Sequence, residues 1–156
     1  MSQEIERKFL FREGYDIPQG NPVRIVQGYL SSVPERTVRV RIKGEKGFLT
    51  IKGIGNETGA SRFEWEQEIP VSDATALLGI CEPGVIDKVR HRMNVGPHLF
   101  EIDQFFGDNE GLILVEVELA HEGEAFDRPE WLGEEVTGDV RYYNSMLMKE
   151  PFTKWK

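Results

Sequence analysis

Apolar and polar residues alternate along most of this chain, with the two-residue period that is typical of β-strands. In residues 112–120, the acidic side chains of Glu116 and Glu118 lie on one face, opposite Val115 and Val117. Seven further segments follow the same pattern. The eight predicted strands are residues 4–11, 24–32, 37–43, 47–52, 62–69, 85–93, 99–106 and 112–120.

Glycine-rich turn sequences separate most of these strands, which favours hairpins and an antiparallel sheet. Helices are fewer. One is expected at residues 73–79, with Ser72 as N-cap and Gly79 as its end, and one or two turns within residues 122–132. The last is expected at residues 140–149 after a cap at Asp139. The predicted fold class is α+β, mainly β, in a single domain that spans residues 1–156.

The polar face of the predicted strands is almost entirely ionic, with nine acidic and nine basic side chains. A solvated sheet face is the simpler interpretation for any single strand. Exposed cross-strand pairs contribute only about 0.2–1 kcal/mol each, however, so stability does not explain the recurrence over eight strands. The acids are Glu4, Glu6, Glu64, Glu66, Glu68, Glu101, Asp103, Glu116 and Glu118. The bases are Lys8, Arg39, Arg41, Lys43, Lys52, Arg62, Lys88, Arg90 and Arg92.

Such a mixture suits a dense polyanion such as a polyphosphate. One arginine side chain binds two phosphate oxygens at once through parallel hydrogen bonds, and lysine adds a point charge. Carboxylates two residues apart on one strand project together and offer hard oxygen ligands for Mg²⁺ or Mn²⁺. A concave face that carries both the basic side chains and the carboxylates is typical of metal-assisted phosphoryl chemistry. If the sheet closes on itself, this face lines a tunnel, and helices cover its apolar outside.

Composition disfavours several classes of protein. The chain has 156 residues, with 19 basic and 27 acidic side chains and a formal net charge of −8, which disfavours a nucleic-acid binder. No apolar run approaches the roughly 18 residues needed to cross a bilayer, so no membrane partner is expected. The first residues lack a secretory signal pattern, and Cys81 stands alone, which excludes an internal disulfide. A cytoplasmic location is expected.

The segment Glu4-Ile5-Glu6-Arg7-Lys8 resembles the ExExK signature of the CYTH, or triphosphate tunnel metalloenzyme, superfamily. The motifs Arg39-Val40-Arg41, Lys88-Val89-Arg90 and Glu116-Val117-Glu118 follow in order, so the resemblance covers nearly the whole chain. It implies an eight-stranded antiparallel closed β-barrel that binds triphosphate and divalent metal inside, with a C-terminal helix at one mouth. The short bacterial members, which this chain is most similar to, hydrolyse inorganic tripolyphosphate.

The resemblance also implies a role for each matching residue. The metal ligands would be Glu4, Glu6, Glu116 and Glu118, with Asp103 as a helper. The phosphates would contact Lys8, Arg39, Arg41, Lys52, Lys88 and Arg90, with Arg62 and Arg92 as secondary contacts. The catalytic set would be Lys8, Lys88, Arg90 and Tyr29, which resembles the tunnel tyrosine of the short members. The supporting carboxylates, which orient the bases or assist a second metal, would be Glu64 and Glu66.

Three other functions stay open at this point. A class IV adenylyl cyclase shares the same tunnel but needs an adenine pocket and a positioned ribose hydroxyl. Thiamine triphosphatase is a further use of the fold. A non-catalytic polyphosphate-binding module would keep the basic residues and could dispense with the metal carboxylates. The expected partner is a small triphosphate, and a homodimer is left open. Trp65 is expected in the core, and Tyr142 and Tyr143 are expected to pack a helix.

Overall fold

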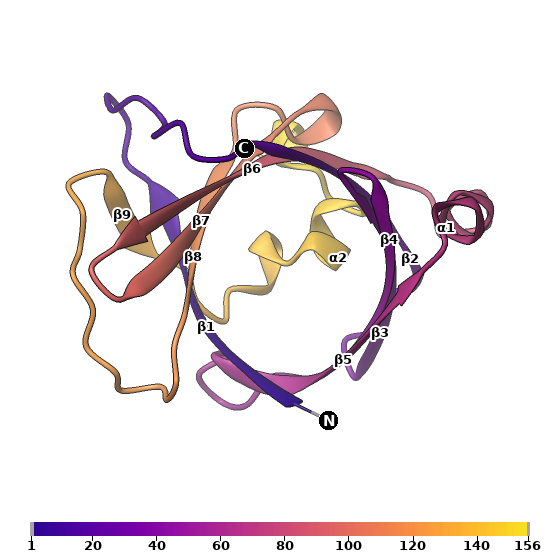
Figure 1. Cartoon of the computed structure of the whole chain (residues 1–156), viewed down its shortest axis with the longest axis horizontal. Helices are drawn as coiled ribbons and strands as arrows, with labels where there is room; N and C mark the ends of the chain where they lie inside the picture. The colour runs from indigo at the N-terminus through magenta and orange to yellow at the C-terminus, as the bar shows by residue number, and fades with distance from the viewer. Residues whose placement is uncertain (1, 156) are drawn as a thin grey trace.

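The computed structural model describes residues 2–155, with side chains from residue 5 onward. Within this range nine strands form one antiparallel sheet, in the order β5-β4-β3-β2-β6-β7-β8-β1-β9. A further pairing of β1 with β5 closes eight of them into the predicted barrel, the ring in Figure 1. The strands are β1 (Ser2–Phe11), β2 (Val23–Ser31), β3 (Arg36–Lys43), β4 (Lys46–Gly53), β5 (Ser61–Ile69), β6 (Ile86–Val95), β7 (His98–Phe105), β8 (Ile113–Glu118) and β9 (Leu132–Glu135).

Tight glycine turns hold neighbouring strands antiparallel. The pair Lys43 and Lys46 closes the hairpin of β3 and β4, and Gly44 in its turn has a φ of +60°. Glycine adopts such a positive φ without steric cost because it has no Cβ. This register lets alternate residues of each strand point into the barrel.

The inward-pointing side chains change character along the barrel axis. At one end they are apolar and pack in a buried cluster with the C-terminal segment. Further along the same strands the inward residues become charged, as where Lys88 and Arg90 follow Ile86 on β6. The strand residues of the apolar cluster are Tyr29, Ile86, Phe105 and Leu114, with Leu112 just before β8. The apolar zone closes one end of the barrel, and the charged zone encloses a cavity.

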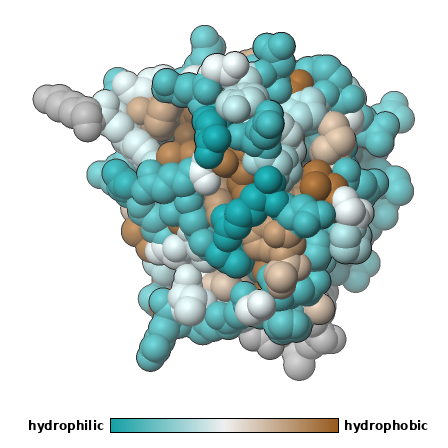
Figure 2. Space-filling model, turned by 90° about the vertical axis from the view of Figure 1, so that its left-hand side faces the viewer, coloured by the Kyte–Doolittle hydropathy of each residue, from teal (hydrophilic) through white to brown (hydrophobic). Residues whose placement is uncertain are grey.

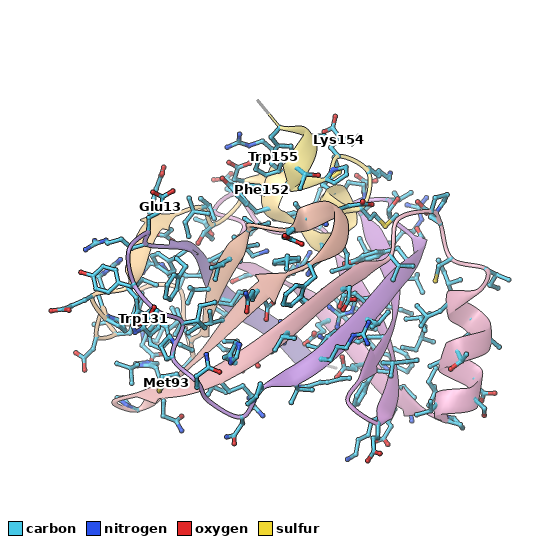
Figure 3. All side chains as sticks on the ribbon, turned by 90° about the horizontal axis from the view of Figure 1, so that it is seen from above. Glu13, Met93, Trp131, Phe152, Lys154 and Trp155 are labelled. Atoms are coloured by element: carbon cyan, nitrogen blue, oxygen red, sulfur yellow. The ribbon has the colours of Figure 1, made fainter. Side chains whose placement is uncertain are left out.

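The C-terminal segment enters the ring instead of covering it. The predicted helix over 140–149 is broken into η2 (Val140–Tyr142) and α2 (Asn144–Leu147), and η3 (Phe152–Lys154) follows. Asp139 caps η2 as predicted, because its side chain accepts a hydrogen bond from the Arg141 backbone N–H at 3.1 Å. Tyr143 is extended, and α2 beyond it lies inside the ring in Figure 1. In Figure 3, Phe152 and Trp155 lie at the end of the barrel where the C-terminal segment enters.

One helix and two irregular segments cover the outside of the barrel. Helix α1 (Val71–Leu78) packs on β2, β3 and β4. It ends at Gly79 as predicted, but it begins at Val71 with Pro70 at the N-cap position, so the Ser72 cap was wrong. Its buried Ala74 lies against Gly47 of β4, where an added Cβ would come within 2.8 Å of the alanine Cβ.

The prediction of helical turns within 122–132 was wrong. That stretch is irregular and leads into β9, which pairs with β1. Its Phe126 and Trp131 cover a buried apolar cluster on the outer face of β1, β7 and β8, and Ile17 adds to the cover from the segment before β2. Figure 2 views this side, where apolar side chains are broken into patches by polar ones.

The outer face of β5 stays partly open. Trp65 is 37% exposed and its neighbour Phe63 42% exposed, so the prediction of a core Trp65 was wrong. The apolar alternation identified the outer face, but the chain places no helix over this strand. Among the described residues, no helix is long and apolar enough to cross a membrane.

Candidate functional site

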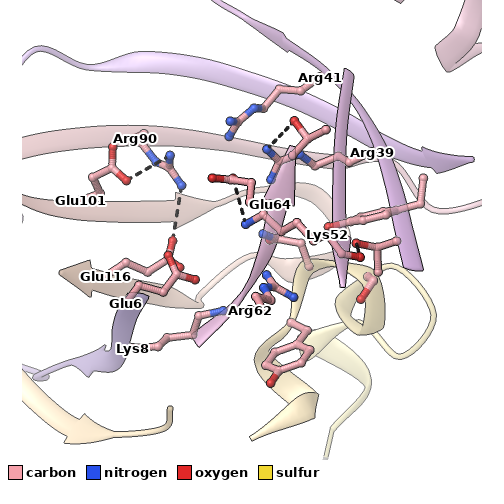
Figure 4. A pocket seen from close by; sticks show the side chains of 16 residues that line it. Glu6, Lys8, Arg39, Arg41, Lys52, Arg62, Glu64, Arg90, Glu101 and Glu116 are labelled. Carbon is pink, nitrogen blue, oxygen red and sulfur yellow. Dashed lines mark hydrogen bonds and ion pairs between the residues drawn. The ribbon is translucent and has the colours of Figure 1, made fainter. Parts of the chain in front are cut away.

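The charged part of the barrel interior forms one cavity, drawn in Figure 4. Its wall holds six lysine or arginine side chains and four carboxylates. Ten of the predicted site residues line it: Glu6, Lys8, Tyr29, Arg39, Arg41, Lys52, Arg62, Glu64, Arg90 and Glu116. They come from seven strands that are far apart in the sequence, and barrel closure brings them together.

Two carboxyl groups meet on one side of the cavity. Lys8 pairs with Glu116 across β1 and β8, so Glu6 and Glu116 point into the barrel side by side. The two carboxyl groups are hydrogen bonded, and Arg90 Nη2 lies 3.5 Å from Glu116. Burial raises the pKa of Glu116, but Lys8, the bond with Glu6 and Arg90 together hold it well below its usual value. Lys8 also donates to the Tyr142 carbonyl at 3.3 Å.

The opposite wall is mainly cationic. Arg39 and Arg41 each lie 3.6 Å from Glu66, which also accepts a hydrogen bond from the Thr50 hydroxyl at 2.7 Å. Burial and the neighbouring Arg39 and Arg90 lower the pKa of Arg41 to about 9. The Nε atoms of both Arg39 and Arg41 are buried without a hydrogen-bond acceptor in the protein. Lys52 faces Glu64 at 3.7 Å.

A buried ion triad is formed by Arg90 with Asp103 and Lys88, which lie behind it. Asp103 accepts two hydrogen bonds from Arg90, at 2.7 and 2.9 Å, and one from Lys88 at 2.8 Å. Burial raises the pKa of Asp103, but the charges of Arg90 and Lys88 hold it well below its usual value. Burial lowers the pKa of Lys88 to about 8. Neither Lys88 nor Asp103 lines the cavity.

The remaining predicted residues lie at the edges of the site. Glu66 supports the two arginines from outside the cavity wall. Arg92 and Glu118 line a separate hollow that shares Glu6, Glu101 and Glu116 with the cavity. The side chain of Glu4 falls outside the described part of the structure, although its backbone pairs with Arg62 of β5.

Sequence reasoning missed part of the cavity wall. Thr37 and Thr50 occupy inward positions, and the strand alternation could have identified both. The alternation did place Glu101 on the ionic face, but Glu101 was given no role in the site. The C-terminal segment supplies Tyr143 and its two neighbours, which the predicted helix over 140–149 assigned to packing and not to the cavity. The residues without a predicted site role are Thr37, Thr50, Glu101, Tyr143, Asn144 and Ser145.

The carboxylates fit a divalent metal that also contacts substrate. From residue 5 onward, no three acidic, histidine or cysteine side chains converge to hold an ion by themselves. Magnesium is commonly held by one or two carboxylates together with waters and substrate phosphates. Glu6 and Glu116 meet this pattern, because two carboxylates at hydrogen-bond distance repel each other when both are ionised and a cation relieves the repulsion.

A family model of the CYTH domain matches residues 2–146. This chain belongs to the CYTH family. A CYTH relative from Acetivibrio thermocellus, named inorganic triphosphatase, is 43% identical over 157 residues, which cover 100% of this chain and 99% of the relative. An inorganic triphosphatase from Nitrosomonas europaea is 39% identical over 92% of this chain and 95% of its own length. The resemblance inferred from the ExExK motif is confirmed.

The CYTH barrel is also found among solved structures. The crystal structure of an inorganic triphosphatase superposes with a TM-score of 0.67 at 37% identity, covering 95% of each chain. The tunnel fold predicted from the motif series is therefore confirmed.

Proposed function

We propose that this chain hydrolyses inorganic tripolyphosphate with a divalent metal ion inside the barrel. The observation that carries the proposal is the cavity itself, where six cationic side chains face the hydrogen-bonded pair Glu6 and Glu116. The cations balance a chain of phosphates, and the carboxylates hold the metal. Relatives that align over nearly the whole chain and are named inorganic triphosphatase support this substrate.

The cationic wall binds and orients the phosphate chain. Arg39 and Arg41 are held by Glu66, which fixes their guanidinium groups toward the cavity. Lys52 and Arg62 extend this wall, and their charges stabilise the equatorial oxygens as charge develops. Burial raises the pKa of Tyr29, so its hydroxyl keeps its proton at neutral pH and can donate to a phosphate oxygen.

The other wall supports the reacting end. Glu6, Glu116 and Glu118, with Glu4 assigned by the motif, would hold Mg²⁺ or Mn²⁺. A bound metal supplies charge neutralisation and a polarised phosphoanhydride bond. Lys8 and Arg90 lie beside Glu116 and stabilise charge on the leaving group. Lys88 acts through Asp103, which keeps Arg90 in place. Arg92 binds at the mouth, where Glu101 lies 3.7 Å from its Nε.

Phosphate release from tripolyphosphate, ATP and thiamine triphosphate tests the proposal. We expect release from tripolyphosphate with Mg²⁺ or Mn²⁺ and none with chelator. Cyclic AMP from ATP would instead establish the cyclase, and tight tripolyphosphate binding without turnover would establish a binding module. The cytoplasmic location and the homodimer stay predictions from the sequence.

A further inference from the structure

A second hollow, of about 230 Å³, adjoins the phosphate cavity. Its volume approaches the roughly 300 Å³ at which small-molecule sites begin. Its wall is largely uncharged, with Pro34, Ile54 and Val140 among its apolar members. Four residues line both the hollow and the phosphate cavity: Thr37, Arg62, Tyr143 and Ser145. These four residues lie where a cationic space meets an apolar one, and we call them the partition.

Tyr143 is the largest side chain of this partition, and it is held on several sides. Its ring centroid lies 5.4 Å from the Lys8 ammonium and 5.5 Å from the Arg62 guanidinium carbon, so both cations face the ring. The loop between β4 and β5 packs closely on its far side, because a Cβ added at Gly59 would lie 3.4 Å from the Tyr143 hydroxyl. The ring is thus held in place where the two spaces meet.

We infer that Tyr143 is a specificity-determining residue that restricts the cavity to inorganic triphosphate. The inference rests on the proposed function. An inorganic chain is anionic along its whole length and matches the cationic wall throughout. A triphosphate ester ends in an uncharged organic group, which the apolar hollow suits in size and polarity. The Tyr143 ring separates that hollow from the phosphates, so an ester cannot use both spaces together.

Replacing Tyr143 with alanine should join the two spaces. With Mg²⁺ present, we expect the ratio of kcat/KM for ATP to kcat/KM for tripolyphosphate to rise by about tenfold or more, the usual range for opening an apolar pocket. The Tyr143→Phe variant keeps the ring and is the matched control, so its ratio should equal that of the wild type. Tyr143→Val replaces the alanine variant if that variant does not fold.

A second substitution tests whether the hollow is the space gained. Val140 lines the hollow and is 54% exposed, so Val140→Trp can fill the hollow with little effect on the core. In the Tyr143→Ala background it should return the ratio to the wild-type value. The inference is overturned if Tyr143→Ala lowers kcat/KM equally for ATP and tripolyphosphate. It is also overturned if the ratio rises in Tyr143→Ala and Val140→Trp does not reverse that rise.

Failure of the proposed function can be distinguished from failure of the inference about Tyr143. A wild-type protein that releases no phosphate from tripolyphosphate refutes that function directly. Calorimetric titration of ATP into wild type and Tyr143→Ala then still tests the partition, because opening it should tighten ATP binding by about tenfold. Unchanged ATP affinity contradicts the role of Tyr143.

Discussion

Individual ionic residues inside the barrel differ in what they contact, and this separates their roles. Asp103 has three hydrogen bonds from Lys88 and Arg90 and is 3% exposed, so its oxygens are occupied by protein donors. It also does not line the cavity that Glu116 faces. We therefore assign Asp103 as a positioning residue for Arg90, in place of the metal-helper role implied by the resemblance.

Asp103→Asn removes the counter-charge of two buried cations. Breaking a buried ion pair by removing one partner costs about 3–5 kcal/mol, so the free energy of unfolding should fall by that amount. The kcat for tripolyphosphate should also fall, while the Mn²⁺ concentration for half-maximal activity stays within about twofold. Denaturant unfolding and metal titration of activity measure both effects.

Asp87→Asn on the same strand pair is the matched control. Asp87 pairs with Arg24 on the outer face of the barrel at 2.8 Å, where Arg24 is exposed and Asp87 is half-buried. The unfolding free energy and activity of this variant should change little. A large increase in the Mn²⁺ requirement of Asp103→Asn, absent from the control, would restore Asp103 as a metal ligand.

Glu116→Gln should separate metal binding from folding. Its side chain faces the cavity and glutamine has the same shape, so the variant should fold, with a thermal midpoint lowered by the lost attraction to Lys8 and Arg90. The loss of a carboxylate ligand should weaken Mn²⁺ binding by at least about 10–100-fold, with a matching loss of tripolyphosphate hydrolysis. Calorimetric Mn²⁺ titration measures this loss. Glu135→Gln changes a carboxylate that contacts Arg7 and the Thr137 hydroxyl away from the cavity, so this variant should bind Mn²⁺ like the wild type.

Which site residues the sequence could reveal depended on whether they lie on a strand. Glu116 and Arg41 were identifiable because alternation assigns every second strand residue to one face. The separate roles of the residues on that face could not be identified, because Asp103 and Glu116 follow the same pattern and differ only in their cross-strand neighbours. The spacing around Tyr143 indicated only a helix packing on the sheet, since the place of this segment inside the barrel depends on distant contacts.

At the scale of elements, the C-terminal segment stabilises the closed end of the barrel. Leu147 of α2 is fully buried in the apolar cluster with Tyr29, Ile86 and Phe105. Leu147→Ala should lower the unfolding free energy by about 2–5 kcal/mol, because it leaves a cavity among strand residues. Urea unfolding measures this loss. Val140→Ala in the same segment changes an exposed side chain and should have little effect, and equal stability of the two variants would contradict this role.

The elements themselves were predictable to different degrees. Period-two alternation located all eight barrel strands, because the two faces of most strands differ in polarity, with ionic side chains inward and apolar ones outward over much of their length. The segment at 122–132 had no such periodicity, and its apolar residues Phe126 and Trp131 act as loop anchors on the sheet. Strand β9 is only four residues long, which is too short for alternation to be recognised.

At the scale of the whole molecule, charge is divided between inside and outside. The chain carries a net charge of −8, whereas the cavity wall has two more cations than carboxylates. The acidic excess therefore lies elsewhere on the molecule. The adjoining hollow is lined by four glutamates, Glu6, Glu101, Glu116 and Glu118, of which the first three also line the cavity. A phosphate chain that enters as its metal complex meets less repulsion there than the free anion.

The charge just behind the cavity wall depends on pH through Lys88. Asp103, Arg90 and Glu116 surround this side chain, and burial lowers its pKa from 10.5 to about 8. Because the folded pKa lies below the unfolded value, the unfolded chain binds more protons between pH 8 and 10.5. The Lys88 contribution to stability without ligand therefore increases with pH across this window.

Binding of tripolyphosphate should have the opposite pH dependence. The anion is attracted to charged Lys88, so the rise in thermal midpoint that it causes in EDTA should be largest below pH 8 and should shrink between pH 8 and 10. A ligand at 100 times its Kd stabilises by about 2.7 kcal/mol, which is measurable by calorimetry. Lys88→Met removes one of the two groups that titrate in this window, the other being Arg41 with a pKa of about 9, so its ligand-induced shift should depend less on pH than that of the wild type. A wild-type shift that stays constant from pH 7 to 10 would contradict this coupling.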